Sequence, residues 1–514
     1  MDGRLRVLRG HLRAVRWHWI AAVAGTWLLV AVVASVLFFL SSERTIDVAS
    51  HEATLRPTLT GQAVVRTGPV LPDLRDSTGS LVGVEIVLGK TDAASLDELS
   101  KRYAAIAANP DAQIENVQDA IVGMAVESGL RGAATGVVPL LVWKAIGRDR
   151  RRVLAAKVRT PAGLAAALAV WLVAAAIVAP WRYVERDAPR EQWESLAAFV
   201  GPDVDLPSEA KGVEVRIDAT TKESRRLVES AVSGYQAGND FYQEAADSAA
   251  DLSLRQPSVG ETVVLLVSDR HDNIGMDPVA RAVADRGGAT AVFDAGDDTS
   301  TGEPWEAFSL DSLASEYDDL PRWAVAGNHD HGTFVREHLE DRGWTYFDGE
   351  PRPGPGGSRV LGVDDPRSSG LGNWRDETGL TFDEVEHRLA DAACDAAENG
   401  DRVGTVLVHD ANLGDEALAR GCVDLVVGGH THVQDGPTRV RGENGEVGYT
   451  YTTGTAGGAA YAIAIGKLRR PAGLSLITYR NGRPVGIQGI TLQTTGRWDV
   501  SPWAPLTYPP GPSE

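Results

Sequence analysis

The chain has 514 residues, of which 43% are hydrophobic and 23% are charged, and this length exceeds what one compact domain usually needs. Residues 1–180 carry 20 Lys+Arg and 15 Asp+Glu, so the remaining 30 basic and 55 acidic residues give residues 181–514 a net charge of −25. Because residues 181–514 carry this much negative charge, they should repel long polyanions. This argues against a general nucleic-acid-binding protein.

The N-terminal segment predicts a membrane anchor. Residues 1–18 are basic, and residues 19–40 (WIAAVAGTWLLVAVVASVLFFL) are uncharged and long enough to cross a bilayer, which needs roughly 20 apolar residues. A cleaved signal peptide would have an apolar core of only about 7–15 residues. We therefore expect an uncleaved anchor with its N-terminus in the cytoplasm.

Two further segments are candidate membrane spans. Residues 161–181 are uncharged, whereas residues 120–146 contain Glu127 and Arg131 at helical i,i+4 spacing, a pairing that reduces the cost of charge inside a span. The loop between them, residues 147–160, is strongly basic and is therefore expected in the cytoplasm, which requires residues 120–146 to cross as well. Three spans place the C-terminal part outside the cytoplasm. Two spans with a re-entrant or surface segment would leave it inside.

Composition and patterning suggest four further regions. Residues 41–119 mix strand-like pieces with an amphipathic helix near residues 95–108, which predicts a small external α+β module without a catalytic motif. Residues 182–258 are expected to form a linker or accessory region. In residues 259–495 short apolar runs alternate with helical stretches, a pattern typical of an α/β domain. The proline-rich residues 496–514 are expected to be a mobile tail.

Five apolar runs of the predicted α/β domain end in residue types that bind metals. These residues are Asp269 and His271; Asp297, after Gly296; Asn328, His329 and Asp330, after Gly327; His409; and His430 and His432, after Gly429. The carboxyl ends of strands form the edge on which α/β sheets bind ligands, and glycine permits close backbone approach there. Each group alone is commonly a turn or a helix cap, but the ordered set predicts a metal centre.

The ordered motifs Asp-x-His, Gly-Asp, Gly-Asn-His-(Asp/Glu), His and Gly-His-x-His resemble those of the calcineurin-like metallophosphoesterase superfamily, here in a membrane-anchored bacterial form. The resemblance covers about residues 263–433 and implies a four-layer α/β/β/α sandwich. It also implies two divalent cations (Mn, Fe or Zn) about 3.5 Å apart, for which carboxylates and imidazoles are suitable ligands. The first cation would be bound by Asp269, His271, Asp297 and His432, and the second by Asp297, Asn328, His409 and His430.

The activity that the resemblance implies is hydrolysis of phosphate mono- or diesters by a hydroxide that bridges the two metals. Asp297 would be the shared ligand. His329 would contact the phosphate and protonate the leaving oxygen, which is typically worth about 10²–10⁴-fold in rate. Asp330 would orient His329 or cap the following helix, with capping favoured, and His331 is a candidate substrate contact.

The sequence leaves the substrate open among lipid, cell-envelope and small-nucleotide phosphates, and membrane lipids are expected partners. Two other functions are a catalytically silent, metal-stabilised scaffold or receptor of the cell envelope and a small-nucleotide phosphodiesterase. The complete ligand set favours an enzyme over the scaffold. Cys394 and Cys422 either form a disulfide, which an extracytoplasmic location permits, or are two separate small buried residues.

Overall fold

The structure is a computed structural model, and it divides the chain into two compact units. One comprises Met1–Thr91 and Ile114–Arg225, and the other comprises Asp92–Gln113 and Arg226–Glu514. The described residues are 2–49, 51–67, 72–91, 111–158, 192–201, 212–217, 237–370, 373–376, 379–458 and 467–509, with four single residues between 160 and 165. The expected helix near residues 95–108 lies outside them.

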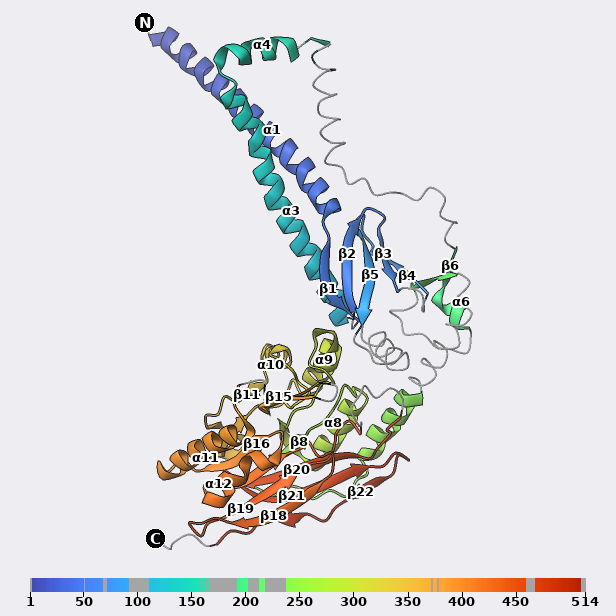
Figure 1. The fold of residues 1–514 in the computed structure, drawn as a ribbon, viewed down its shortest axis with the longest axis vertical. Coiled ribbons are helices and arrows are strands. Elements are labelled where there is room, and N and C mark those ends of the chain that lie inside the picture. Colours follow the sequence, from blue (N-terminus) through green and yellow to red (C-terminus); the bar gives the residue numbers. More distant parts are fainter. Residues whose placement is uncertain are drawn as a thin grey trace. The chain divides into compact units, whose positions relative to one another are not determined.

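The first unit combines helices with a seven-stranded sheet of order β1-β2-β5-β3-β4-β7-β6 (Figure 1). The helices are α1 (Asp2–Ser41), α3 (Asp111–Ala145), α4 (Arg148–Val158) and α6 (Leu196–Val200). The strands are β1 (Arg44–Val48), β2 (His51–Thr58), β3 (Gln62–Arg66), β4 (Leu74–Ser77), β5 (Gly83–Thr91), β6 (Gln192–Ser195) and β7 (Glu214–Ile217). The predicted module of residues 41–119 is thus completed by two strands from residues 182–258.

The prediction that residues 182–258 form one linker or accessory region is therefore wrong. β7 pairs with β4, and Val215, which is fully buried, stands opposite Leu74. Further along, Phe241 and Tyr242 pack in a cluster with Met276 of the second unit's own core. The region is divided between the two units because its apolar residues are buried in both cores.

One helix among the described residues is long and apolar enough to cross a membrane, through the stretch Val23–Ser41 of α1. Such a stretch suits either a membrane anchor or a signal sequence. The predicted second span, residues 120–146, falls within α3 but is less apolar, because Glu127 and Arg131 interrupt it. The predicted third span, residues 161–181, lies almost entirely outside the described residues. The expectation of three spans is therefore not supported beyond the first.

The second unit contains two large sheets. The eight-stranded sheet has the order β11-β10-β9-β8-β20-β21-β22, with β23 also paired to β21, and the six-stranded sheet has the order β12-β13-β16-β17-β19-β18. The strands of the first are β8 (Glu261–Val267), β9 (Ala289–Asp294), β10 (Arg322–Ala324), β11 (Thr345–Tyr346), β20 (Ala472–Arg480), β21 (Arg483–Leu492), β22 (Trp498–Val500) and β23 (Ala504–Pro505). Those of the second are β12 (Arg352–Pro353), β13 (Arg359–Val363), β16 (Val403–Val408), β17 (Val423–Gly428), β18 (Asp435–Arg441) and β19 (Val447–Thr452).

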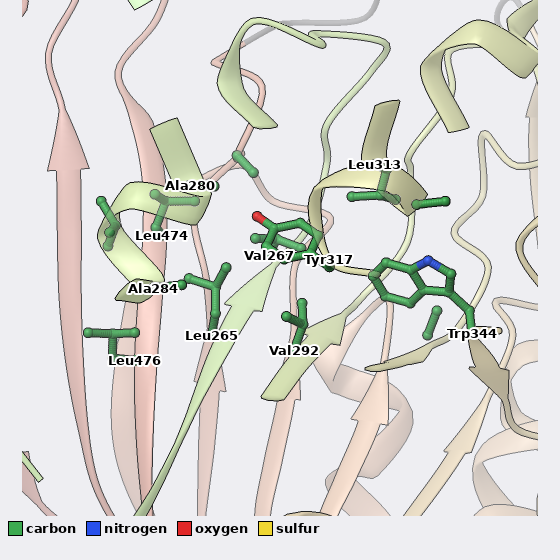
Figure 2. Packing of buried hydrophobic residues seen from close by; sticks show 14 of the residues in the cluster. Leu265, Val267, Ala280, Ala284, Val292, Leu313, Tyr317, Trp344, Leu474 and Leu476 are labelled. Carbon is green, nitrogen blue, oxygen red and sulfur yellow. The ribbon is translucent and has the colours of Figure 1, made fainter. Parts of the chain in front are cut away.

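Alternating side chains of the central strands explain how the layers stack. Leu265 of β8 faces α8 (Met276–Gly287) and α9 (Ala307–Glu316), whereas Leu266 faces the second sheet in a shared core with Leu425 and Val427 of β17. Figure 2 shows the first of these clusters, with the helices packed on the sheet. Val426 faces α11 (Phe382–Glu398) and α12 (Asp415–Arg420) on the other side. The mixed α/β fold is confirmed, and its layers run helix, sheet, sheet, helix.

The C-terminal residues and the cysteines are fixed in this core. The prediction of a mobile tail at residues 496–514 is wrong up to residue 509, because β22 and β23 both pair with β21 and Leu506 is buried. Residues 510–514 lie outside the described residues. Cys394, in α11, and Cys422, just before β17, form a disulfide.

Candidate metal centre

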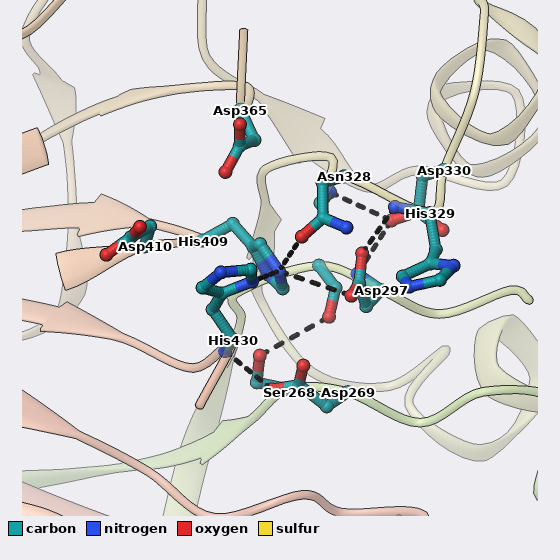
Figure 3. Close-up of polar contacts among 12 residues, drawn as sticks. Ser268, Asp269, Asp297, Asn328, His329, Asp330, Asp365, His409, Asp410 and His430 are labelled. Carbon is teal, nitrogen blue, oxygen red and sulfur yellow. Dashed lines mark hydrogen bonds and ion pairs between the residues drawn. The ribbon is translucent and has the colours of Figure 1, made fainter. Parts of the chain in front are cut away.

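The seven predicted ligands lie at the carboxyl ends of buried strands. Figure 3 shows Asp269, Asp297, Asn328, His409 and His430 around one site. Asp269 and His271 follow β8, Asp297 follows β9, Asn328 follows β10, His409 follows β16, and His430 and His432 follow β17. β8, β9 and β10 are parallel neighbours, and so are β16 and β17, so their carboxyl ends reach the same side. Residues up to 163 positions apart in sequence are therefore brought together.

The loops that carry the ligands are held in conformations that most residues avoid. Asp269, His271, Asp297, His430 and His432 all have φ between 46° and 66°, in the left-handed region. A non-glycine residue there costs roughly 1–2 kcal/mol, and such strain is concentrated at functional sites. Hydrogen bonds between loops offset it: the amides of Asp269 and His271 donate to the carbonyls of Gly296 and Asp297, at 2.8 and 3.0 Å.

Two of the predicted glycines leave space for ligand carboxylates. A Cβ atom at Gly327 would overlap Oδ1 of Asp297, and one at Gly429 would overlap Oδ2 of Asp269. Both carboxylate oxygens accept backbone hydrogen bonds, Asp297 Oδ1 from His329 N at 2.7 Å and Asp269 Oδ2 from His430 N at 2.9 Å. The expected role of glycine at this edge, close backbone approach, is confirmed.

The first group of ligand atoms comes from Asp269, His271, His432 and Asp297. His432 Nε2 lies 3.1 Å from Asp269 Oδ1 and 3.3 Å from His271 Nε2. His271 Nε2 lies 3.9 Å from Asp297 Oδ2. Three of these four residues form one of the groups whose donor atoms could hold a cation, among the described residues.

The second group of ligand atoms surrounds His409. Its Nε2 lies 3.2 Å from Asp297 Oδ2, 3.0 Å from Asn328 Oδ1 and 3.3 Å from His430 Nδ1. Because Asp297 Oδ2 also lies 3.9 Å from His271 Nε2, one carboxylate oxygen lies between the two groups. This is the arrangement that the sequence motifs predict for a bridging ligand.

The donor atoms fit two divalent cations. Ligand atoms bound at about 2.1 Å to one cation stand roughly 3.0–3.4 Å apart, close to most of the separations above. His409 Nδ1 donates to the Ala295 carbonyl at 2.7 Å, so a neutral ring directs its Nε2 lone pair toward the oxygens of Asp297 and Asn328. Asp269 Oδ1 is buried without a hydrogen-bond partner. A cation would stabilise the lone pairs that face one another here, and it would also stabilise the carboxylate oxygen that lacks a hydrogen-bond partner.

The pKa shifts of these residues also favour the binding of cations. Burial alone would raise the pKa of Asp297, but the adjoining His409 and the nearby His271 and His329 hold it well below its usual range. Burial lowers the pKa of His271 to about 4, so its ring is neutral and can act as a ligand at physiological pH. Burial also opposes protonation of His409, yet Asp297 raises its pKa well above the usual value. A cation would take the place of that proton.

His329 and Asp330 lie beside the ligands, and Asp330 has a different role from the one favoured by the sequence. His329 Nδ1 lies 3.1 Å from the Ser300 carbonyl. The Asp330 carboxylate accepts from the amides of Gly327 (2.9 Å), Asp297 (2.8 Å) and Thr299 (3.0 Å). The following helix, α10 (Phe334–Glu340), has no side-chain cap. Asp330 therefore fixes the loop that carries Asp297 and does not cap a helix.

His331, the candidate substrate contact, lies next to His329, with 6.5 Å between ring centroids. Its Nδ1 contacts Ser368 Oγ, on β14 (Arg367–Gly370), which pairs with β15 (Asn373–Asp376). The structure thus places His331 beside the catalytic candidate. Its contact with substrate stays a prediction.

The sequence did not identify two arginine networks near the predicted ligands. Arg270 lies between two ligands and donates to Asp277 Oδ1 at 3.0 Å and to the Ser309 carbonyl at 2.7 Å, which ties the β8 loop to α8 and α9. Arg367 Nη2 lies 2.8 Å from carboxylate oxygens of Asp365 and Asp410. Arg270 could have been noticed in the sequence, because it lies within the Asp-x-His motif. No sequence pattern indicates that Arg367 pairs with Asp410, which is 43 residues away.

Comparison with known proteins agrees with this geometry. Residues 262–434 match the family model of the calcineurin-like phosphoesterases. Among solved structures the chain is similar to TT1561 of Thermus thermophilus (13% identity, TM-score 0.30, covering 47% of this chain and 98% of that one). It is also similar to a protein serine/threonine phosphatase from Saccharomyces cerevisiae (9% identity, TM-score 0.20, covering 54% and 91%).

A search among curated proteins gave no match. Structural likeness at such low TM-scores does not bear on activity, so the assignment depends on the family model and on the convergence of the ligands. The chain contains a calcineurin-like phosphoesterase domain at residues 262–434.

Proposed function

We propose that the chain is a dinuclear-metal phosphoesterase that hydrolyses phosphate mono- or diesters and is anchored in a membrane. The observation that carries the catalytic part is the position of Asp297 Oδ2, 3.2 Å from His409 Nε2 and 3.9 Å from His271 Nε2. A single carboxylate oxygen shared by two sets of imidazole donors is what a bridging ligand requires.

The ligand residues would hold the two cations, and the remaining polar groups would act on the substrate. Two divalent cations bound here would supply an activated water and offset charge on the phosphoryl oxygens. His329 is anchored at both its backbone and its ring, by Asp297 Oδ1 and the Ser300 carbonyl, and its Nε2 would be the ring atom that protonates the departing oxygen. His331, beside it, would contact the leaving group.

Metal-dependent hydrolysis of aryl phosphate esters tests this proposal. The full-length protein in detergent, loaded with Mn²⁺, should hydrolyse 4-nitrophenyl phosphate or its bis-ester. Asp297→Asn and His430→Ala should each lower kcat/KM by at least about 10³-fold, since each removes a ligand. His387→Ala is the matched control, because His387 is an exposed histidine on α11. Failure of the metal-loaded wild type to hydrolyse either type of ester would contradict the proposal.

The membrane part of the proposal is supported by the packing of α3 on α1 within the first unit. A Cβ atom at Gly132 would lie 2.6 Å from the Ala31 carbonyl oxygen, and one at Gly136 would lie 2.8 Å from the Trp27 carbonyl oxygen, so the two backbones are in close contact. Trp27 Nε1 donates to the Ala133 carbonyl at 3.0 Å. Small residues spaced four apart allow such contacts between helices in lipid.

Both helices also expose large apolar side chains away from this contact. They include Leu28, Leu29, Val32 and Val36 on α1 and Val126, Leu130, Val138, Leu141 and Val142 on α3. We infer that α1 and α3 form an antiparallel pair in contact with lipid, with the basic α4 in the cytoplasm and residues 161–181 as the third span. The Cys394–Cys422 disulfide supports an oxidising location for the phosphoesterase domain.

Topology reporters test the membrane part separately from the chemistry. Alkaline phosphatase fused after residue 91 should be active, because that position is expected outside the cytoplasm, and the same fusion after residue 158 should be inactive. The opposite result, or release of the full-length protein from membranes by alkaline carbonate, would contradict the proposed topology. Lipid or cell-envelope phosphates are the substrates we propose for a site held near a bilayer, and a panel of both distinguishes them from small nucleotides.

A further inference from the structure

We propose that Glu306 is a positioning residue for His329 and acts through the peptide unit between Ser300 and Thr301. The proposal rests on the proposed function, because it assigns a role in protonating the leaving group. The carbonyl of this peptide unit accepts from His329 Nδ1 at 3.1 Å. Its N–H group, on Thr301, donates to Glu306 Oε1 at 3.0 Å. One peptide unit therefore connects the carboxylate to the imidazole.

The Glu306 carboxylate is fully buried and accepts four hydrogen bonds from one loop. Its Oε1 accepts from the amides of Ser300 (2.9 Å) and Thr301 (3.0 Å), and its Oε2 accepts from the Thr301 hydroxyl (2.8 Å) and the Glu303 amide (2.8 Å). A carboxylate with four donors fixes the Ser300–Thr301 peptide in one orientation. Asp272 Oδ2 also accepts from the Ser300 amide at 3.0 Å and holds the same loop against the β8 loop.

The effect on His329 follows from the geometry of the peptide group. Because Glu306 Oε1 accepts from the N–H group of this peptide, it fixes the direction of the carbonyl group at the other end of the same peptide. That carbonyl can only accept, so the His329 ring that contacts it is held with Nδ1–H toward Ser300. The Nε2 atom of His329 is then the atom that delivers a proton. Glu306 does not touch the reacting atoms.

His329 has a second contact, through its backbone, and this contact distinguishes the positioning role of Glu306 from metal binding. The His329 amide donates to Asp297 Oδ1 at 2.7 Å, so its backbone position depends on the bridging ligand, whereas its ring depends on Ser300. Loss of the Glu306 contacts should therefore disturb proton transfer more than metal binding. The sequence contains a pattern that marks Glu306. Glu303-Pro304-Trp305-Glu306 has the spacing of a capping box, and Glu303 and Glu306 do form one.

The dependence of the rate on the leaving group tests this role. In Glu306→Gln one carboxylate oxygen becomes an NH₂ group. In one orientation it faces the amides of Ser300 and Thr301, and in the other it faces the Glu303 amide, so at least one backbone hydrogen bond is lost either way. Full-length, Mn²⁺-loaded protein is assayed on 4-nitrophenyl phosphate, whose leaving group needs little protonation, and on phenyl phosphate, whose leaving group needs it. We expect kcat to fall about tenfold more on the phenyl ester than on the 4-nitrophenyl ester, with KM within about twofold and metal content unchanged.

A double-mutant cycle with His329→Ala gives the second measurement. In the His329→Ala background Glu306→Gln should have no further effect on either ester, since the two residues act in series. Glu337→Gln is the matched control: it makes the same chemical change in an exposed residue of α10 and should leave the leaving-group preference unchanged. If Glu306→Gln does not fold, Thr301→Val removes only the hydroxyl bond and should shift the preference in the same direction by about threefold.

The outcomes separate the two proposals. Equal losses of kcat on both esters, or additive effects with His329→Ala, would overturn the role of Glu306 while the wild-type activity still supported a phosphoesterase. A wild type inactive on both esters, with metal bound, would overturn the proposed function and this inference with it.

Discussion

The loop that carries Asp297, the proposed bridging ligand, should depend on Asp330, and Asp330→Asn tests this dependence. Asp330 Oδ2 accepts from the amides of Asp297 and Gly327, at 2.8 and 2.9 Å, and Oδ1 accepts from the amide and hydroxyl of Thr299, at 3.0 and 2.8 Å. The side chain is 2% exposed, so water cannot replace a lost partner. In asparagine one of the two oxygens becomes an NH₂ group. Two of these four hydrogen bonds are lost if that group faces the amides of Asp297 and Gly327, and one is lost if it faces Thr299, whose hydroxyl can accept from it.

The expected cost follows from these contacts. Hydrogen bonds to a charged group contribute about 1.5–3 kcal/mol each, so the loss of one or two destabilises the unit by roughly 1.5–6 kcal/mol. Burial raises the pKa of Asp330, as does the nearby Asp297 carboxylate. Because a carboxylate with a raised pKa holds its charge less firmly, we expect the loss of stability to lie toward the lower end of this range. Because Asp297 is displaced along with its loop, affinity for Mn²⁺ should fall as well.

Denaturant unfolding of the full-length protein and calorimetric titration with Mn²⁺ measure the two effects. Asp341→Asn, a change at an exposed aspartate after α10, is the control and should shift unfolding by less than about 0.5 kcal/mol. If Asp330→Asn changed stability by less than about 1 kcal/mol and left Mn²⁺ affinity within about twofold, the Asp330 hydrogen bonds would not be what fixes the loop.

Two further predictions concern stability. Because the Cys394–Cys422 disulfide joins residues 28 apart in sequence, replacing both cysteines with alanine should lower the free energy of unfolding by about 3.5 kcal/mol, measured by denaturant titration; an unchanged midpoint would contradict this. Burial lowers the pKa of His271 to about 4, so its contribution is complete above about pH 6.5 and is lost as the pH falls toward 4. In metal-free protein the stability difference between wild type and His271→Gln should shrink by roughly 3 kcal/mol over that range, and a constant difference would refute it.

The sequence alone determined the strand ends, the candidate ligand residues and the resemblance of residues 262–434 to the calcineurin-like phosphoesterases. Local patterns carry this information: apolar runs such as Val403–Val408 and Val423–Gly428 are buried on both faces, and the residues after parallel strands lie at one edge. Short motifs then identify the ligands without knowledge of the partners, because each ligand follows directly from its own strand. The first apolar helix was also evident from length and composition.

Only the tertiary structure decided the roles that depend on contacts between distant segments. Asp330 holds a loop more than 30 residues away, β7 completes a sheet begun over 100 residues earlier, and Arg367 pairs with Asp410 across 43 residues. The tail likewise became two edge strands because β21 offers unpaired backbone groups and an apolar surface. Hydrogen bonds and burial of this kind are set by the packing of whole layers, so no local pattern of residues encodes them.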